Sequence, residues 1–276
     1  MSDAAVDLLH ATLRWLHVAA AVFWVGAAFA FGTLRRRVEK LPDESARRSI
    51  ALQAFPGLLG WLRWGAAVTW MLGFVLLFLL YYRAPLLLDT GELDPVRLGS
   101  LLQPDGRPSP RAWIPGFLAL LAAFPLYELS VRFLRGPLSL WLGLPLWFAV
   151  AIGLSCLLES ESGFSNRAVF VHIATYLATA MAANVWMRIW PAERAALLAR
   201  AAGEAPDASS LALSRVRQRH NGAMALSVLL LMLSTHHTSL YSDTPWPWPW
   251  VAAVVMVLGF ALAELLAKLS DGFSVE

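Results

Sequence analysis

The chain alternates between long apolar blocks and short polar stretches. The blocks are about twenty residues long, which is the length that an α-helix needs to cross the hydrocarbon core of a bilayer. They lack the residue-by-residue apolar and polar alternation of a transmembrane β-barrel. The pattern therefore predicts an all-α fold, a polytopic transmembrane helix bundle that forms one integral membrane domain over residues 1–276. Seven spans are expected, at about residues 8–34, 58–82, 112–131, 137–158, 167–190, 220–241 and 249–268.

Composition supports a membrane protein and narrows its chemistry. Of the 276 residues, 58% are hydrophobic and only 15% are charged, too few to cover a water-exposed surface. The single cysteine, Cys156, excludes an intramolecular disulfide, a Cys-x-x-Cys pair and the attachment motif of a c-type haem, so any haem would be held non-covalently. The first residues, Met1–Asp7, carry no Lys or Arg, so we expect no cleavable signal peptide and a first span that is retained.

The distribution of Lys and Arg predicts the orientation. Fifteen of these residues lie in the loops after the first, third and fifth expected spans or at the C-terminus, and six lie on the other side. Positive charge concentrates in cytoplasmic loops, so the N-terminus is expected outside and the C-terminus in the cytoplasm of a bacterial inner membrane. Because the arginines flank apolar spans, they indicate topology, and nucleic acid is not expected as a partner.

Histidines carry the main functional signal. In the predicted topology His17, His172, His236 and His237 lie at similar depths in the outer leaflet, while His220 stands apart at the cytoplasmic start of its span. Ionisable residues inside a membrane are costly and usually face the interior of the bundle for a functional reason. The pattern therefore predicts a functional site in the outer leaflet and gives no second histidine pair in the inner one.

Two histidines at matched depth on different helices are what a b-type haem requires. We therefore expect haem b, with His17, His172 and His236 as candidate iron ligands. Arg14 lies three residues before His17 on the same helical face, where it would suit the haem propionates. Two alternatives stay open: each histidine ties helices together through hydrogen bonds, or the same histidines hold copper or zinc.

Other polar residues are interpreted as structural. Glu128 with Arg132, and Glu264 with Lys268, are spaced four residues apart and are expected to form ion pairs within their helices. Asn184 lies deep in the fifth expected span, within a run of small residues, and is interpreted as a contact between helices.

Several segments together resemble the membrane domain of bacterial urate hydroxylases, the family labelled urate oxidase N-terminal. The resemblance covers most of the chain in matching order and is most specific in the fifth and sixth expected spans. It rests on Leu13-Arg14-Trp15-Leu16-His17, Trp24-Val25-Gly26, Trp61-Leu62-Arg63-Trp64, Thr69-Trp70, Tyr81-Tyr82, Tyr127-Glu128, Arg167 to Pro191 with Met181-Ala182-Ala183-Asn184-Val185, and Arg219-His220-Asn221 through Leu231-Met232-Leu233-Ser234-Thr235-His236.

The resemblance implies an inner-membrane oxidoreductase that hydroxylates urate to 5-hydroxyisourate with water and passes the electrons to cytochrome c. Two departures from the family pattern are visible. Residues 52–57 read Leu-Gln-Ala-Phe-Pro-Gly, where such proteins carry a segment of the His-Gly-Gly-Gly-Phe type, and the further span and cytochrome c domain of those proteins are not in this sequence. We therefore expect a separate periplasmic cytochrome c as partner. The catalytic residues stay unassigned.

Two readings from other functional classes remain open beside the redox enzyme. The first is a non-catalytic subunit or assembly factor of a respiratory complex, which would keep the bundle and use its tryptophan-rich surfaces to contact partner subunits. The second is a copper-handling membrane protein. An optical spectrum with a Soret band would favour the haem protein over both.

Overall fold

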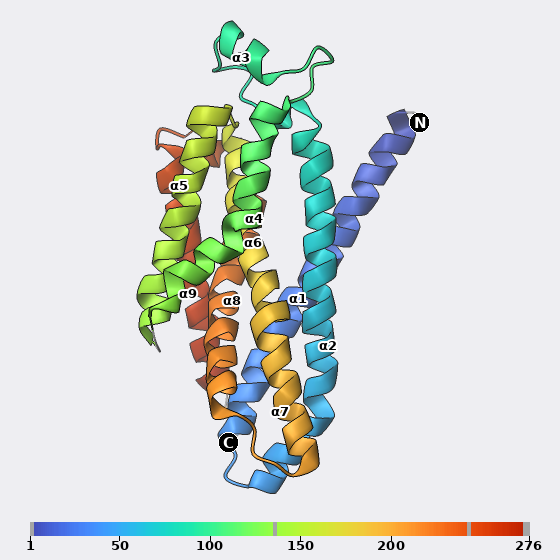
Figure 1. Ribbon diagram of the computed structural model, residues 1–276, viewed down its shortest axis with the longest axis vertical. Coiled ribbons are helices and arrows are strands. Elements are labelled where there is room, and N and C mark those ends of the chain that lie inside the picture. Colours follow the sequence, from blue (N-terminus) through green and yellow to red (C-terminus); the bar gives the residue numbers. More distant parts are fainter. Residues whose placement is uncertain (1–2, 135–136, 242–243, 273–276) are drawn as a thin grey trace.

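The computed structural model describes residues 3–134, 137–241 and 244–272, and these ranges are helical almost throughout (Figure 1). Within them there is no strand, only the isolated β-bridges Leu88–Phe164 and Leu102–Pro108. The predicted all-α bundle is confirmed. In chain order the α-helices are α1 (Asp3–Glu39), α2 (Glu44–Leu77), α3 (Pro95–Leu101), α4 (Pro110–Arg132), α5 (Leu144–Ser162), α6 (Asn166–Asn184), α7 (Trp190–Ala202), α8 (Ala208–Ser234) and α9 (Trp248–Gly272).

Six helical segments in the described ranges are long and apolar enough to cross a bilayer. Two of them join several elements through π-helical turns: Glu44–Tyr82 continues α2 through η1 (Phe78–Tyr82), and Asn166–Ala202 joins α6, η4 (Val185–Ile189) and α7. A third π-helical turn, η3 (Ser139–Gly143), opens α5. The protein is thus a multi-pass helical membrane protein, as predicted.

The sixth predicted span, 220–241, corresponds to only part of a helix. Helix α8 is 27 residues long, but its first half carries several arginines and it ends at Ser234. The chain then makes a turn and the short 3-10 helix η5 (Thr238–Leu240). The segment 220–241 therefore combines the second half of α8 with the turn and η5.

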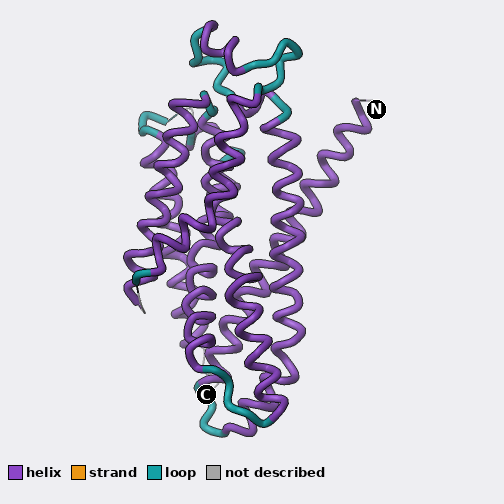
Figure 2. Tube along the Cα trace, viewed as in Figure 1, coloured by secondary structure: helices purple, strands orange, loops and turns teal. Residues whose placement is uncertain are grey.

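Helix α6 occupies the centre of the bundle. In its segment 72% of the most apolar window is buried, against at most 39% in the other five segments. Helix α1 leans away from the bundle over its first half (Figure 1), and loops lie at the two ends (Figure 2). We call the end covered by α3 the α3 end, which the charge pattern predicts to be the outer side, and the other the opposite end.

Side-chain caps and glycines set the helix boundaries at the loops. The Asp207 carboxylate accepts hydrogen bonds from the backbone N–H groups of Ser209 and Ser210 at the start of α8. Hydrogen bonds from the side chains and backbone of Ser210 and Ser209 lower the pKa of Asp207 to about 2. At the C-terminal ends of α5 and α7, Gly163 (φ 67°) and Gly203 (φ 81°) adopt the left-handed conformation that favours glycine.

A cation-π cluster marks one level of the bundle. The Arg63 guanidinium lies 4.3 Å from the ring centre of Trp186, 4.7 Å from that of Trp190 and 5.3 Å from that of Trp64. Tryptophan and arginine favour the interface between the hydrocarbon core and water. Tyr82 lies about 19 residues further along the same helical segment, or roughly 28 Å, close to the thickness of the hydrocarbon core. The cluster therefore fits one edge of the membrane, with Tyr82 near the other.

Candidate functional site

The π-helical turn that ends α2 presents Tyr82 to the centre of the bundle. Tyr82 is 2% exposed, and its hydroxyl lies 3.1 Å from Nε2 of His172 on α6. The other ring nitrogen of His172, Nδ1, lies 2.7 Å from the carbonyl oxygen of Ala168. A carbonyl oxygen can only accept, so Nδ1 donates, and in the neutral ring Nε2 is the acceptor. The Tyr82 hydroxyl therefore donates a hydrogen bond to His172 Nε2.

Aromatic rings enclose His172, which is fully buried. The Phe164 ring centre lies 4.8 Å from the imidazole centre, and the Tyr176 ring lies against another side at 6.1 Å. Gly116 of α4 permits this close packing, because a Cβ there would lie 2.8 Å from Phe164 and 3.3 Å from His172 Nε2. The enclosure leaves the imidazole no polar neighbour at Nε2 other than Tyr82 among the described residues.

A cavity of about 280 Å³ lies directly beside Tyr82 at the α3 end. Its size falls near the lower limit of small-molecule sites, which run from about 300 to 1,000 Å³. Tyr82 stacks on Trp113, with ring centres 5.8 Å apart, and Trp113 also meets Phe78 edge to face. The lining residues are Phe78, Tyr82, Arg83, Gln103, Arg107, Pro108, Pro110 and Trp113. Aromatic faces and two guanidinium groups thus surround a space whose wall includes Tyr82, the hydrogen-bonding partner of His172.

The predicted haem ligands are not brought together. His17 of α1 faces α2, where its Nδ1 lies 3.0 Å from the carbonyl oxygen of Thr69 and its ring packs on Gly73. His172 meets the same helical segment at Tyr82, nine residues after Gly73, or roughly 13 Å further along the axis. Axial ligands of one haem iron must approach it from opposite faces of a single porphyrin. With the helices in these positions, His17 and His172 do not fit one haem.

The remaining predicted site residues lie at the surface. His236 and His237 follow the end of α8 and are exposed, because the helix stops at Ser234. Arg14 is exposed on the diverging half of α1. Among the described residues, no group of three or more His, Cys, Asp or Glu side chains has the geometry to hold a metal ion. Haem binding therefore stays a prediction.

A second buried tyrosine–histidine pair lies nearer the opposite end and contains His220, for which no second histidine was predicted in its leaflet. The Tyr127 hydroxyl of α4 lies 2.7 Å from Nδ1 of His220, 2.9 Å from Arg217 and 3.0 Å from the amide nitrogen of Asn184. Asn184 also donates to Asn221 at 2.9 Å. Tyr127, Asn184 and His220 are fully buried. This polar cluster therefore links α4, α6 and α8 through the centre of the bundle.

Ion pairs around the polar cluster differ from those predicted. Glu128 binds Arg188 at 2.9 Å and also Arg217, and not Arg132 of its own helix. Glu264 binds Arg219 of α8 at 2.8 Å, and not Lys268. Both predicted pairs within a helix were wrong, because these carboxylates bind arginines of neighbouring helices instead.

Sequence reasoning missed Tyr82, Arg83 and Trp113 as site residues, although Tyr82 and Arg83 had a signal. Tyr81-Tyr82-Arg83 ends an apolar run and resembles the aromatic and basic boundary of any span. The loop containing Gln103 and Arg107 is folded back by a backbone hydrogen bond from Gln103 to Arg107, which places both side chains beside that boundary. Only the folded loop shows that these residues share a cavity.

Comparison with known proteins gives the family. The chain matches the family described as urate oxidase N-terminal over residues 3–270, almost its whole length. Searches of the curated proteins and of the solved structures found no match. The match agrees with the resemblance carried by the sequence motifs. With the helical membrane bundle on which these residues are placed, the match shows that the chain belongs to the urate oxidase N-terminal family.

Proposed function

We propose that the protein is an oxidoreductase of a bacterial inner membrane that hydroxylates urate to 5-hydroxyisourate in the cavity beside Tyr82. One observation carries this assignment: a purine-sized cavity between aromatic rings and guanidinium groups shares a wall with a buried Tyr82–His172 hydrogen bond. Membership of the urate oxidase N-terminal family supports the choice of substrate.

The lining chemistry suits urate. Urate is planar, anionic at neutral pH and edged with carbonyl oxygens and N–H groups. The Trp113 and Phe78 rings offer flat apolar surfaces for stacking. Arg83 and Arg107 offer forked donors to carbonyl oxygens and to the anionic ring, and the Gln103 amide can both donate and accept. Arg83 forms no side-chain hydrogen bond or ion pair within the described residues, so its guanidinium is available to a ligand.

The reaction needs an acceptor for protons and one for electrons. The water oxygen bonds to C5 of urate and loses one proton, urate loses one N–H proton, and two electrons leave. The Tyr82 oxygen can accept one proton from the substrate side while its own proton moves to His172 Nε2. The second proton passes to bulk water at the side of the cavity where Arg83 is exposed. Two molecules of oxidised cytochrome c, supplied as a separate periplasmic protein, take the electrons. Burial of His172 keeps bulk water from competing for that proton.

Urate consumption tests the proposal. The protein in nanodiscs is given urate and oxidised cytochrome c, and we expect two cytochromes reduced for each urate lost. Arg83→Gln should raise KM for urate at least about tenfold, because a charge-assisted hydrogen bond contributes roughly 1.5–3 kcal/mol. Arg111→Gln is the matched control, since Arg111 is exposed at the same end but does not line the cavity.

The outcomes separate the functional classes. Absence of urate loss, with the protein folded and cytochrome c present, would sink the enzymatic proposal and favour a non-catalytic subunit or assembly factor of a respiratory complex. Equal KM values for Arg83→Gln and wild type would move the substrate away from this cavity.

The optical spectrum tests the haem prediction separately. A Soret band that His17→Ala or His172→Ala removes, and that His220→Ala leaves, would support haem b on the predicted ligands, with α1 moved relative to α2 from its present position. Purified protein without a Soret band would leave the cavity as the site of chemistry and the haem prediction wrong.

A further inference from the structure

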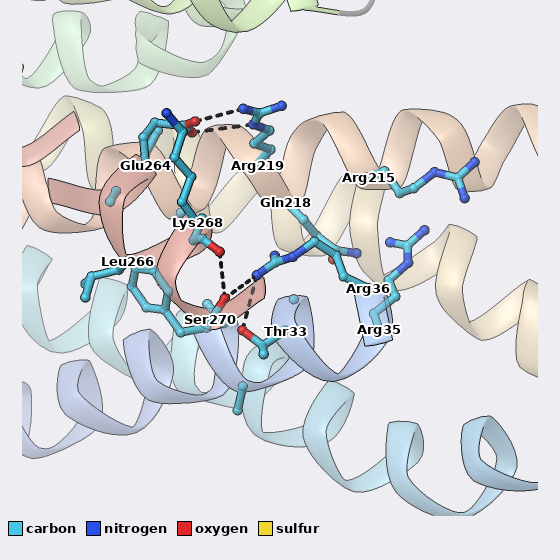
Figure 3. A pocket seen from close by; sticks show the side chains of 18 of the residues that line it. Thr33, Arg35, Arg36, Arg215, Gln218, Arg219, Glu264, Leu266, Lys268 and Ser270 are labelled. Atoms are coloured by element: carbon cyan, nitrogen blue, oxygen red, sulfur yellow. Dashed lines mark hydrogen bonds and ion pairs between the residues drawn. The ribbon is translucent and has the colours of Figure 1, made fainter. Parts of the chain in front are cut away.

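A second and larger cavity lies between α1, α8 and α9 toward the opposite end (Figure 3). Its volume is about 720 Å³, and it is separate from the proposed urate site. Small residues form its floor, so the three helices leave the space between them unfilled. The floor residues are Ala28, Gly32, Gly222, Ala223 and Ala263.

The rim of this cavity is strongly basic. Five basic side chains line it, Arg35, Arg36, Arg215, Arg219 and Lys268, against the two carboxylates Glu39 and Glu264. Glu193 pairs with Arg35 at 2.6 Å from outside the cavity, and the balance stays positive when that third carboxylate is counted. A cavity with this excess of charge attracts an anion.

The rim also offers hydrogen-bond donors at a defined place. Arg36 donates to the Ser270 hydroxyl at 2.9 Å and to Thr33 at 3.3 Å, which holds its guanidinium across the cavity mouth (Figure 3). Lys268 is exposed and forms no hydrogen bond or ion pair with any residue that the structure describes. Its ammonium group is therefore free to pair with an oxyanion.

The floor of the cavity begins at the level of lipid headgroups. Trp24 of α1 packs against Gly65, next to the Arg63 cluster that fits one membrane edge. The floor residues Ala28 and Gly32 follow Trp24 by four and eight residues, or roughly 6 and 12 Å beyond that edge. Apolar side chains flank the cavity on α9, where Leu262 and Leu266 are 45% and 47% exposed. An acyl chain could lie along them while its headgroup enters the basic rim.

We propose that this cavity binds the phosphate headgroup of an anionic phospholipid from the same leaflet. Basic pockets between transmembrane helices bind such headgroups by charge and by hydrogen bonds. The lipid would fill the space between α1 and α9 and fix the lean of α1. A free phosphate ion shares the oxyanion chemistry but lacks the apolar chains that the exposed leucines would cover.

Native mass spectrometry of the full chain, released from nanodiscs, tests this. The probes are phosphatidylglycerol, phosphatidylcholine with the same acyl chains, and inorganic phosphate. We expect one phosphatidylglycerol to be retained in preference to phosphatidylcholine. Each surface charge contributes about a fivefold change in affinity, so Lys268→Gln should weaken retention about fivefold and Lys268→Glu roughly thirtyfold. Lys40→Glu is the matched control, because Lys40 is the chain's other lysine and lies outside the cavity.

Three results would overturn the proposal. Equal retention of the two lipids would remove the charge argument, and equal loss in Lys268→Glu and Lys40→Glu would show a diffuse surface effect. Inorganic phosphate that binds as tightly as phosphatidylglycerol would identify a free anion as the occupant. Thermal midpoints of both lysine variants guard against misfolding, and Lys268→Gln, which adds no negative charge, serves if Lys268→Glu fails to fold.

Discussion

The bundle contains two buried tyrosine–histidine pairs with opposite surroundings. Tyr82 binds one partner, His172, and its ring forms a wall of a cavity. Tyr127 binds His220 together with Arg217 and Asn184, and lines neither described cavity. The first pair has an unused oxygen lone pair beside open space, while the second is saturated by protein. The same two residue types therefore suit proton transfer with a ligand in one place and the joining of helices in the other.

The several hydrogen bonds around Tyr127 also predict how much each pair contributes to stability. Buried polar groups cost little when all their partners are present and much when one is removed. Tyr127 satisfies donors from α6 and α8 at once, so its hydroxyl holds three helices in register. Tyr82 satisfies a single ring nitrogen. The comparison predicts that mutations in the two pairs separate stability from activity.

The largest effect is expected from Tyr127→Phe. It removes the partner of three buried groups, each of which costs about 1–3 kcal/mol when unsatisfied, so we expect a loss of roughly 3 kcal/mol or more. Tyr82→Phe is the matched control and should cost about 1 kcal/mol. Thermal unfolding in detergent measures both. Equal losses would mean that the two pairs do the same structural work.

Histidine substitutions test the chemical side of the comparison. His172→Gln should lower kcat for urate about a hundredfold, because it removes the proton acceptor behind Tyr82. That loss corresponds to about 2.7 kcal/mol of transition-state stabilisation. His220→Gln should leave kcat per folded molecule close to wild type while it lowers the thermal midpoint. A reversed result would transfer the chemistry to the polar cluster around Tyr127.

Gly116→Ala changes the enclosure of His172 and leaves both of its hydrogen-bonding partners in the sequence. The added methyl group would lie 2.8 Å from Phe164, so we expect overpacking to cost about 1–2 kcal/mol and to displace the ring from His172. Gly153→Ala in α5 is the control, since beyond its chain neighbours and the adjacent backbone of α5 no atom lies within 4 Å of a Cβ there. Thermal midpoint and urate KM are measured for both variants. If both glycines tolerate alanine equally, close packing around His172 is unimportant.

The smallest effect is expected outside both pairs, at the Asp207 cap of α8. Hydrogen bonds from Ser210 and Ser209 lower the pKa of Asp207 to about 2 in the folded protein, below the ordinary aspartate value of about 3.9. Its contribution to stability is therefore present above the unfolded pKa and is lost as the pH falls toward 2. Asp207→Ala should lower the thermal midpoint slightly at pH 7, and the difference from wild type should shrink below about pH 4. A difference that is independent of pH would assign the effect to helix propensity.

The sequence was sufficient to predict the helices, but not to predict which neighbouring helix each side chain faces. Apolar block length predicted the bundle because hydrocarbon thickness fixes helix length. Depth along a span placed His17 and His172 in one half of the molecule, but depth does not say which neighbour a side chain meets. His17 faces α2 and His172 faces both α2 and α4, which only packing decides. His236 is exposed for another reason: α8 ends at Ser234, although no glycine or proline marks a helix end at that point.

The ion pairs show a similar limit. Glu128 and Arg132 satisfy the spacing rule for a helix, yet Glu128 is reached by Arg188 and Arg217 from other helices. The spacing rule considers only two residues of one helix in water. In a bundle, cations on other helices compete for the same carboxylate. The Tyr127 cluster was hidden for the same reason, since its members come from three helices and no single stretch of sequence contains a motif.

The Arg63 cluster has a further consequence for the shape of the protein in a cell. If this ring of tryptophans marks the membrane edge, the segments of 39 and 37 residues that cross it are far longer than the roughly 20 residues that a bilayer accommodates. The residues of these segments beyond the bilayer, together with the ends of α1 and α8, form a group of helices that extends about 25 Å into the aqueous phase. The paired Arg35 and Glu193 lie on α1 and α7 beyond the cluster, and their ion pair joins these two helices where they leave the headgroup layer.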